Sequence, residues 1–320
     1  MGDTRRMDER GGAPDVARRR ALRLAGAVAA SVAGCATAPP VAPPAASARP
    51  AAPVPPPPPP KPPKFGLALG GGAARGFAHV GVIQVLEEAG LRPDLVVGTS
   101  AGSLVAALYA TGRTGAQLQQ AAESMDEATI TDWTLPLFNR GMLRGEALAR
   151  YVNTLVSNRL LEQMPLPLGI VATRLDTGEG VLFRRGDTGM AVRASSAVPA
   201  VFLPVRISGV EYVDGGLVAP VPVRYARQMG AEVVLAVDIS AAPEGNPASD
   251  TLQMLLQTFA IMGKSINTFE LRDADVVVRP ALVGVGSANF TAKRQAIDAG
   301  RAAMRAALPQ LKSAIEAKHR

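Results

Sequence analysis

The sequence LALGGGAARGFAHVGV, residues 67–82, places three consecutive glycines between an apolar run and a helical pattern. The sequence VVGTSAGS, residues 96–103, repeats this arrangement with a serine between two glycines. Each stretch predicts a buried strand, a sharp turn and a helix. Two such units in succession indicate an α/β protein.

The same alternation continues along the chain. Strands are predicted at 65–69, 95–97, 168–172, 233–237 and 276–278, and helices at 75–89, 101–111, 143–158, 188–196, 221–229 and 251–271. Because these strands are apolar throughout, we expect a sheet covered on both faces. The predicted fold is a three-layer α/β/α sandwich around a mainly parallel sheet, in one domain of residues 65–320. Residues 294–317 have amphipathic helical spacing interrupted by Pro309, and core packing is their expected role.

The N-terminal residues form a pattern of their own. The sequence ARRRALRLAGAVAASVAGC, residues 17–35, has a basic flank, a short apolar stretch and the chain's one cysteine. The order resembles bacterial lipoproteins, which implies that residues 1–34 are a signal peptide and that Cys35 is acylated after cleavage. Two or three acyl chains would anchor the protein in the cell envelope, with the domain in the periplasm. Ala36 is not the aspartate associated with inner-membrane retention, which favours the outer membrane. The alternative is a basic leader with an incidental cysteine.

Residues 35–64 continue with a proline-rich stretch, ending PVPPPPPPKPPK. Such density excludes helix and central strand and favours an extended polyproline II conformation. After Cys35, this stretch predicts a tether between a membrane surface and the domain. The alternative is a ligand for a proline-binding module.

The charge of the chain excludes one class of partner. The formal net charge is +7, of which residues 1–34 carry seven arginines and four acidic residues, or +3. The remaining +4 is spread thinly, with no dense basic block, so a nucleic-acid groove is not expected. With a single cysteine, the chain has neither an internal disulfide nor a cysteine-based metal site.

Ser100 has the surroundings of a nucleophile. In a Gly-x-Ser-x-Gly turn between a strand and a helix, the glycines let the two elements approach while the serine occupies a strained turn. Here those glycines are Gly98 and Gly102. The helix N-terminus also favours a developing anion. The alternative is an ordinary N-cap serine.

Three explanations compete for Gly70–Gly72 and the following Arg75 and Gly76. A dinucleotide fingerprint requires glycines where Ala73 or Arg75 stand, and a phosphate loop requires a Gly-Lys-Ser/Thr that is absent. The third explanation is an oxyanion hole made of backbone amides, and it uses the loop and Ser100 together.

The serine also needs a base, and the chain has only two histidines. His319 is the penultimate residue, and His79 is expected in the core or on a helix surface. A carboxylate acting directly remains, and Asp214, before Gly215 and Gly216, would lie at a strand end. Spacing alone does not separate it from Asp176 or Asp238.

Five stretches together resemble the bacterial patatin-like phospholipase family: LALGGGAARGFAHVGV, GTSAGS, MLRGEAL (142–148), AVRASSAVPAVFLPV (191–205) and YVDGGLVAPVPV (212–223). The resemblance covers about residues 65–240. It implies a Ser-Asp dyad without histidine, with Ser100 as nucleophile and Asp214 as base. It also implies that Gly71 and Gly72 supply the oxyanion donors. The supporting motif residues are Gly70, Arg75, Gly76, Gly98, Gly102, Gly215 and Gly216.

The loop departs from the family at Ala73, where another glycine is usual. If the loop needs positive φ there, the methyl group strains it. For Arg75, we favour a bracing role through a carboxylate over contact with a phosphate or carboxylate of the substrate.

The expected function is a serine hydrolase of phospholipase A type, which cleaves acyl esters of lipids through an acyl-enzyme. Its expected partners are a lipid substrate and a membrane surface, and neither a metal nor another cofactor is implied. Two alternatives stay open: an esterase or thioesterase for small soluble acyl compounds, and a non-enzymatic envelope lipoprotein that retains the fold.

Overall fold

The computed structural model of the chain describes residues 61–134, 140–243, 248–286 and 289–319. The predicted signal peptide, Cys35 and nearly all of the proline-rich tether lie outside the described residues and stay predictions. The described residues belong to one compact unit.

The centre of the fold is a parallel sheet whose strands follow the predicted apolar runs. Five strands lie in the order β10-β9-β1-β2-β4, each parallel to its neighbours. Their bounds are β1 Phe65–Leu69, β2 Leu95–Thr99, β4 Leu168–Arg174, β9 Val233–Val237 and β10 Val276–Val278. All residues of β1, β2 and β9 are buried, which explains why these strands are apolar without alternation.

Beyond β4 the sheet becomes antiparallel, which the apolar runs did not predict. Strands β5 and β8 both pair antiparallel with β4, and β7 pairs antiparallel with β8. Their bounds are β5 Gly180–Phe183, β7 Val205–Ile207 and β8 Val210–Asp214. A separate two-stranded sheet joins β3 (Gly141–Leu143) to β6 (Ala200–Phe202).

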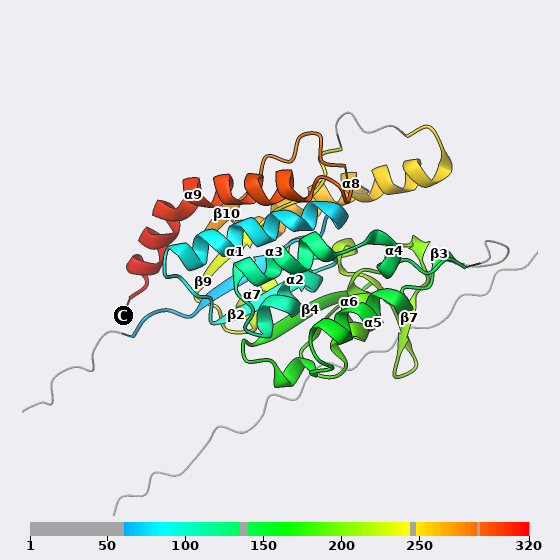
Figure 1. Cartoon of the computed structure of the whole chain (residues 1–320), viewed down its shortest axis with the longest axis horizontal. Helices are drawn as coiled ribbons and strands as arrows, with labels where there is room; N and C mark the ends of the chain where they lie inside the picture. Colours follow the sequence, from blue (N-terminus) through cyan, green and yellow to red (C-terminus); the bar gives the residue numbers. More distant parts are fainter. Residues whose placement is uncertain (1–60, 135–139, 244–247, 287–288, 320) are drawn as a thin grey trace, which may run out of the picture. The chain divides into compact units, whose positions relative to one another are not determined.

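Helices cover the sheet on both faces, and Figure 1 shows α1 and α9 side by side along one of them. The long helices are α1 Ala78–Glu88, α2 Ala101–Ala110, α3 Gly115–Ser124, α5 Glu146–Leu155, α6 Thr188–Ser195, α8 Thr251–Glu270 and α9 Lys293–Ala317. The short ones are η1 Ala73–Phe77, α4 Glu127–Ile130, η2 Leu161–Gln163, η3 Gly215–Leu217, α7 Val223–Gln228 and η4 Leu271–Asp273. Helices α3 and α4 were not predicted. All the helices that were predicted are present, with shifted ends.

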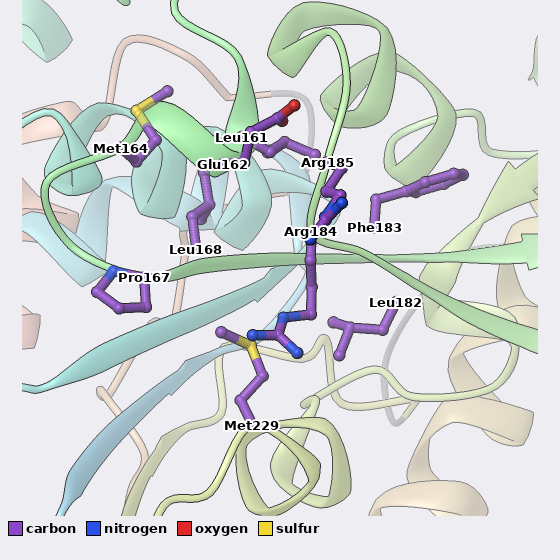
Figure 2. Close-up of a pocket in the computed structure, with 10 residues that line it drawn as sticks. All are labelled: Leu161, Glu162, Met164, Pro167, Leu168, Leu182, Phe183, Arg184, Arg185 and Met229. Atoms are coloured by element: carbon purple, nitrogen blue, oxygen red, sulfur yellow. The ribbon is translucent and has the colours of Figure 1, made fainter.

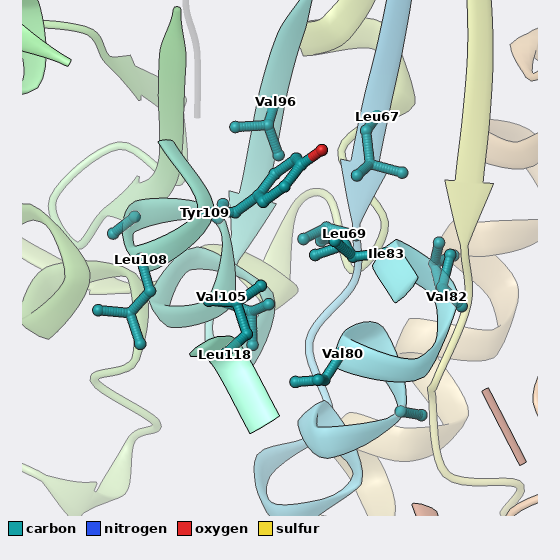
Figure 3. Close-up of a cluster of buried hydrophobic side chains, with 14 of the residues drawn as sticks. Leu67, Leu69, Val80, Val82, Ile83, Val96, Val105, Leu108, Tyr109 and Leu118 are labelled. Atoms are coloured by element: carbon teal, nitrogen blue, oxygen red, sulfur yellow. The ribbon is translucent and has the colours of Figure 1, made fainter. Parts of the chain in front are cut away.

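The core divides into layers as the fold class predicts. Figure 3 shows Leu67 and Leu69 of β1 beside Val82 and Ile83 of α1, and the same cluster extends to Val105 of α2. Other residues of β1 and β2 point to the opposite face of the sheet. Among them, Ala68 and Val97 pack in a second cluster with Val223 and Ala226 of α7. Alternate strand residues point to opposite faces, so the sheet separates two apolar layers. The three-layer α/β/α fold is therefore confirmed.

Helix α9 holds α1 at close range. An ideal Cβ at Gly81 would lie 2.0 Å from the Ile297 carbonyl oxygen, and one at Gly300 would lie 2.0 Å from that of Ala78. Only glycine fits at both positions. Ile297, Met304 and Leu311 are buried at seven-residue spacing, which confirms the predicted core role.

The proline within this segment does not end the helix. Helix α9 continues through Pro309. Figure 1 shows its last turns bending away from the axis of the first part, as expected where a proline removes a hydrogen bond inside a helix.

Candidate active site

The turn between β2 and α2 holds Ser100 in a conformation that is rare for a residue with a side chain. Its φ is 51° and its ψ is −123°. An ideal Cβ at Gly98 would lie 2.4 Å from the Gly102 carbonyl oxygen, and one at Gly102 would lie 2.2 Å from that of Leu69. The two glycines therefore let the strand, the helix and the neighbouring β1 approach, and the strain falls on Ser100.

Two other serines hold this turn in place. The backbone N–H of Ser100 donates to Ser195 Oγ at 2.8 Å, and that hydroxyl donates to the Val171 carbonyl oxygen at 2.5 Å. The Ser103 hydroxyl donates to the Ser100 carbonyl oxygen at 2.6 Å. Ser195 is fully buried and links the turn to β4. Its stretch contributed to the family resemblance, but sequence reasoning assigned it no role.

The register of β4 brings Asp214 to the same place. Thr99, which precedes Ser100, lies opposite Val171, and Asp214 lies opposite Ala172, the next residue of β4. An ideal Cβ at Gly215 would lie 2.2 Å from the Val171 carbonyl oxygen, so the chain leaves β8 in close contact with β4. Residues more than a hundred positions apart in the sequence thus reach one point of the sheet.

The Asp214 carboxyl group is buried and only partly satisfied. Its Oδ1 accepts from the Gly216 N–H at 2.6 Å, whereas its buried Oδ2 has no hydrogen-bond partner among the described residues. Burial raises the pKa of Asp214 to about 6, while the Gly216 N–H and the nearby Ser100 hydroxyl lower it less strongly. The hydroxyl influences the carboxyl group without meeting the geometry of a hydrogen bond. An oxygen with a free lone pair and a pKa near neutrality can accept a proton.

Of the two backbone N–H groups expected to stabilise the oxyanion, those of Gly71 and Gly72, only one is free of a backbone partner in the described part of the chain. The Gly70 N–H donates to the Val237 carbonyl oxygen at 3.0 Å, and the Gly71 N–H donates to that of Pro220 at 2.9 Å. The expected use of Gly71 as an oxyanion donor therefore needs correction, because its amide is already engaged. In the described part of the chain, Gly72 and Ala73 have no backbone partner for their N–H groups.

The loop does require positive φ at position 73. Ala73 has a φ of 49°, the region that favours glycine, so its methyl group adds strain. Ala73 is exposed and lies against both cavities that reach Ser100.

The remaining loop residues are Arg75 and Gly76, and Gly76 lines the smaller cavity at Ser100. An ideal Cβ at Gly76 would lie 2.9 Å from the Ala101 Cβ, so this glycine lets the loop pack on α2. Burial lowers the pKa of Arg75, and its buried Nε has no hydrogen-bond partner among the described residues. No ion pair of Arg75 is present in the described ranges, so the expected bracing through a carboxylate is not seen; Asp238 acts on it only at longer range.

His79 takes the core role that the sequence favoured. It is fully buried in α1, and burial lowers its pKa to about 4. Its ring is therefore neutral at pH 7, and Nε2 donates to the Gly70 carbonyl oxygen at 2.8 Å. His79 supports the glycine loop and lines neither cavity at Ser100.

Ser100 lies where two cavities meet. One, of about 260 Å³, is bounded by the glycine loop, Asp214 and α8 residues such as Leu256 and Phe259. The other, of about 150 Å³, is almost entirely apolar and includes Leu148 and Phe202. Leu148 and Phe202 belong to two of the stretches that carried the family resemblance. Those stretches therefore converge around one hydroxyl group.

A larger cavity of about 610 Å³ lies at the opposite end of β4. Figure 2 shows its walls, where Arg184 extends toward Met229 and Glu162 is the one carboxylate. No serine or cysteine lines this cavity, and its carboxylate, Glu162, accepts a hydrogen bond from the Gly186 N–H. The cavity therefore contains no nucleophile for acyl transfer.

Among the described residues, no group of three or more His, Cys, Asp or Glu side chains could hold a metal ion. Among the described helices, none combines the length and apolar character needed to cross a membrane.

Residues 67–227 match the family described as patatin-like phospholipase. An uncharacterized NTE family protein of Mycobacterium tuberculosis is 37% identical over 185 residues, 58% of this chain and 51% of the relative. A second such protein from that species is 31% identical over 273 residues, 76% of this chain and 46% of the relative. The chain thus spans about half the length of these curated relatives. The crystal structure of VipD from Legionella pneumophila shares the fold, with a TM-score of 0.51, 15% identity, and coverage of 79% of this chain and 67% of that one.

Proposed function

Because the chain belongs to the patatin-like phospholipase family, we propose that it hydrolyses acyl esters of lipids with Ser100 as nucleophile and Asp214 as base. One observation carries the proposal: a buried carboxylate oxygen, with no hydrogen-bond partner among the described residues, shares a cavity with a serine hydroxyl on a strained turn. The neutral, engaged His79 is not available for the role that histidine has in a triad.

In the first half of the reaction, Asp214 Oδ2 takes the hydroxyl proton as Ser100 Oγ bonds to the ester carbonyl carbon. The carbonyl oxygen becomes an oxyanion, for which the Gly72 N–H is the available donor, with the Ala73 N–H beside it. The tetrahedral intermediate collapses, the carbon–oxygen bond to the alcohol breaks, and protonated Asp214 returns its proton to the leaving alkoxide oxygen.

In the second half, Asp214 takes a proton from water as the water oxygen attacks the acyl-serine carbonyl carbon. A second tetrahedral intermediate forms, and the same backbone N–H groups stabilise its oxyanion. Its collapse breaks the bond to Ser100 Oγ, which regains a proton from Asp214, and the fatty acid leaves. The base returns to its ionised form, so one carboxylate serves both halves.

The apolar cavity favours a fatty acyl ester as the substrate. Leu104, Val105, Leu148 and Phe202 offer an acyl chain an almost wholly apolar surface beside Ser100. The wider cavity under α8 is open to the leaving alcohol, whether a lysophospholipid or a smaller group. Phospholipase A-type cleavage follows if a phospholipid is the substrate.

Labelling by a fluorophosphonate probe tests the proposal directly. The wild-type protein should be labelled, and Ser100→Ala should not. A panel of phospholipids and esters of increasing acyl length, with Ser100→Ala as blank, then separates a lipid hydrolase from an esterase of small soluble compounds. Absence of both labelling and turnover in a folded wild-type protein would favour the non-enzymatic alternative.

We further propose that an acylated Cys35 keeps the enzyme at a bacterial membrane, beside its substrate. Cys35→Ser should move the protein from the membrane fraction to the soluble fraction without changing turnover of a soluble ester. Unchanged fractionation would remove the anchor from the proposal and leave the chemistry at Ser100 intact.

A further inference from the structure

Helix α8 carries an apolar stripe on its outer side. Met254, Ile261, Met262 and Phe269, here called the outer stripe, expose 55%, 52%, 46% and 65% of their surfaces. Their spacing of seven, one and seven residues places them on one side of the helix. Figure 1 shows the first turns of α8 at the periphery of the fold. A soluble domain rarely exposes several large apolar side chains together without a partner for them.

The opposite side of α8 faces the candidate active site. Leu256, Phe259, Ala260 and Gly263 line the cavity that contains Ser100 and Asp214. Met262 belongs to the outer stripe and also lines this cavity, and Leu256 lines it while remaining 39% exposed. The apolar surface therefore continues from the outside of α8 into the cavity at Ser100.

The charges on this helix suit a lipid surface. Residues 251–269 contain no aspartate or glutamate and one basic residue, Lys264. The acidic residue that ends α8, Glu270, is buried and paired with Arg224 at 2.7 Å. Just beyond, the guanidinium of Arg272 lies 4.9 Å from the centre of the Phe269 ring. An aromatic ring beside an arginine suits the boundary between acyl chains and anionic head groups.

We propose that the outer stripe docks α8 flat on the surface of a lipid bilayer, so that a lipid passes along the α8 apolar surface into the cavity at Ser100. The inference rests on the proposed function, since it names how that site receives its substrate. Helix α8 is not apolar enough to cross a membrane, which fits a helix lying in the interface. Continuity with the cavity favours a lipid over a second copy of the chain, because a protein partner would not need a path to Ser100.

The test uses the full-length chain carrying Cys35→Ser, so that no acyl chain at Cys35 holds it on vesicles. In this background we compare the wild-type stripe with the triple variant Met254→Gln/Ile261→Gln/Phe269→Gln. None of these three residues lines the cavity at Ser100. Binding is measured by co-sedimentation with phosphatidylethanolamine vesicles, with and without phosphatidylglycerol.

The triple variant should bind vesicles at least about tenfold more weakly, because interfacial binding scales with the apolar area buried. Its hydrolysis of vesicle lipid should fall by a similar factor, whereas its turnover of a soluble short-chain ester should stay within about twofold. Leu175→Gln is the matched control at an exposed apolar residue outside α8, 43% exposed, and should change none of these readings. Ile261→Leu should bind as the wild-type stripe does.

Three outcomes would overturn the inference: equal vesicle binding by both proteins, no vesicle binding by the wild-type stripe, or a dimer that the triple variant dissociates without loss of vesicle binding. A failure of the proposed function gives a different result, since turnover of every ester would then be absent. Vesicle binding does not depend on turnover and still decides the role of α8.

Discussion

The proposed nucleophile and base come from two halves of the sheet that are built differently. Ser100 follows β2, in the parallel half, where every residue of the strand is buried. Asp214 ends β8, in the antiparallel half, where β5 is half-exposed along its whole length. Among the described strands, only β4 pairs with strands of both halves. The strained serine therefore follows a strand that is buried along its whole length, whereas Asp214 ends a strand between β4 and β7 that is buried only in its last three residues.

The largest effect is expected when the proposed nucleophile or the proposed base is removed, which takes one functional group from each half of the sheet. Ser100→Ala and Asp214→Asn should each lower kcat by at least about 10³-fold, and the double variant should be no worse than either, because the two groups act as one unit. Kinetics on a soluble ester provide the measurement, with thermal unfolding to verify the fold. Near-normal turnover by Asp214→Asn would refute the dyad.

The pH dependence isolates the contribution of the antiparallel half. Because burial raises the pKa of Asp214 to about 6, kcat/KM should be flat above pH 6 and fall about tenfold per pH unit below it. The folded state binds this proton more tightly than the unfolded state, so the stability it contributes is present at low pH and is lost as pH rises through about 6. Asp214→Asn should remove this slope from the unfolding free energy. A rate profile with its midpoint near pH 4 would contradict the burial argument.

Ser195→Ala tests the link that crosses between the halves. The change leaves the Ser100 N–H and the Val171 carbonyl oxygen without their present partner, at a cost of about 1–3 kcal/mol. We expect kcat to fall about tenfold through misplacement of the nucleophile, with KM nearly unchanged. Ser195→Thr keeps the hydroxyl group and should recover part of kcat. If the alanine variant loses stability alone, Ser195 has only a structural role.

His79→Ala should have the smallest effect on turnover, because His79 supports the glycine loop and lines neither cavity at Ser100. The Gly70 carbonyl oxygen loses its donor, which should cost about 1–3 kcal/mol of stability. Activity should stay within about tenfold of the wild-type value, measured on a soluble ester below the unfolding temperature. Activity as low as that of Ser100→Ala would return a histidine to the mechanism.

The parallel half could be predicted from sequence because burial on both faces leaves a strong signal. Strands β1, β9 and β10 begin and end where the apolar runs do, and β2 and β4 extend the predicted runs by two residues each. The glycines at 98 and 102 also signalled the turn at Ser100, since no other residue fits there.

The antiparallel half and the amide donors could not be predicted in the same way. Strands of three to five residues with mixed exposure lack a clear pattern, so Asp214 was distinguished from other aspartates only by family resemblance. The engagement of the Gly71 N–H depends on Pro220, which is distant in sequence. A contact of that kind follows from the tertiary fold and leaves no local signal.

The close packing of α1 against α9 has a consequence for the timing of folding. The glycine loop leads directly into α1, and α1 rests on Ile297 and Gly300 of a helix made more than two hundred residues later. During synthesis the loop therefore lacks its support until α9 has left the ribosome. We expect the nascent chain to be unable to hold the glycine loop in its final position before α9 has been made.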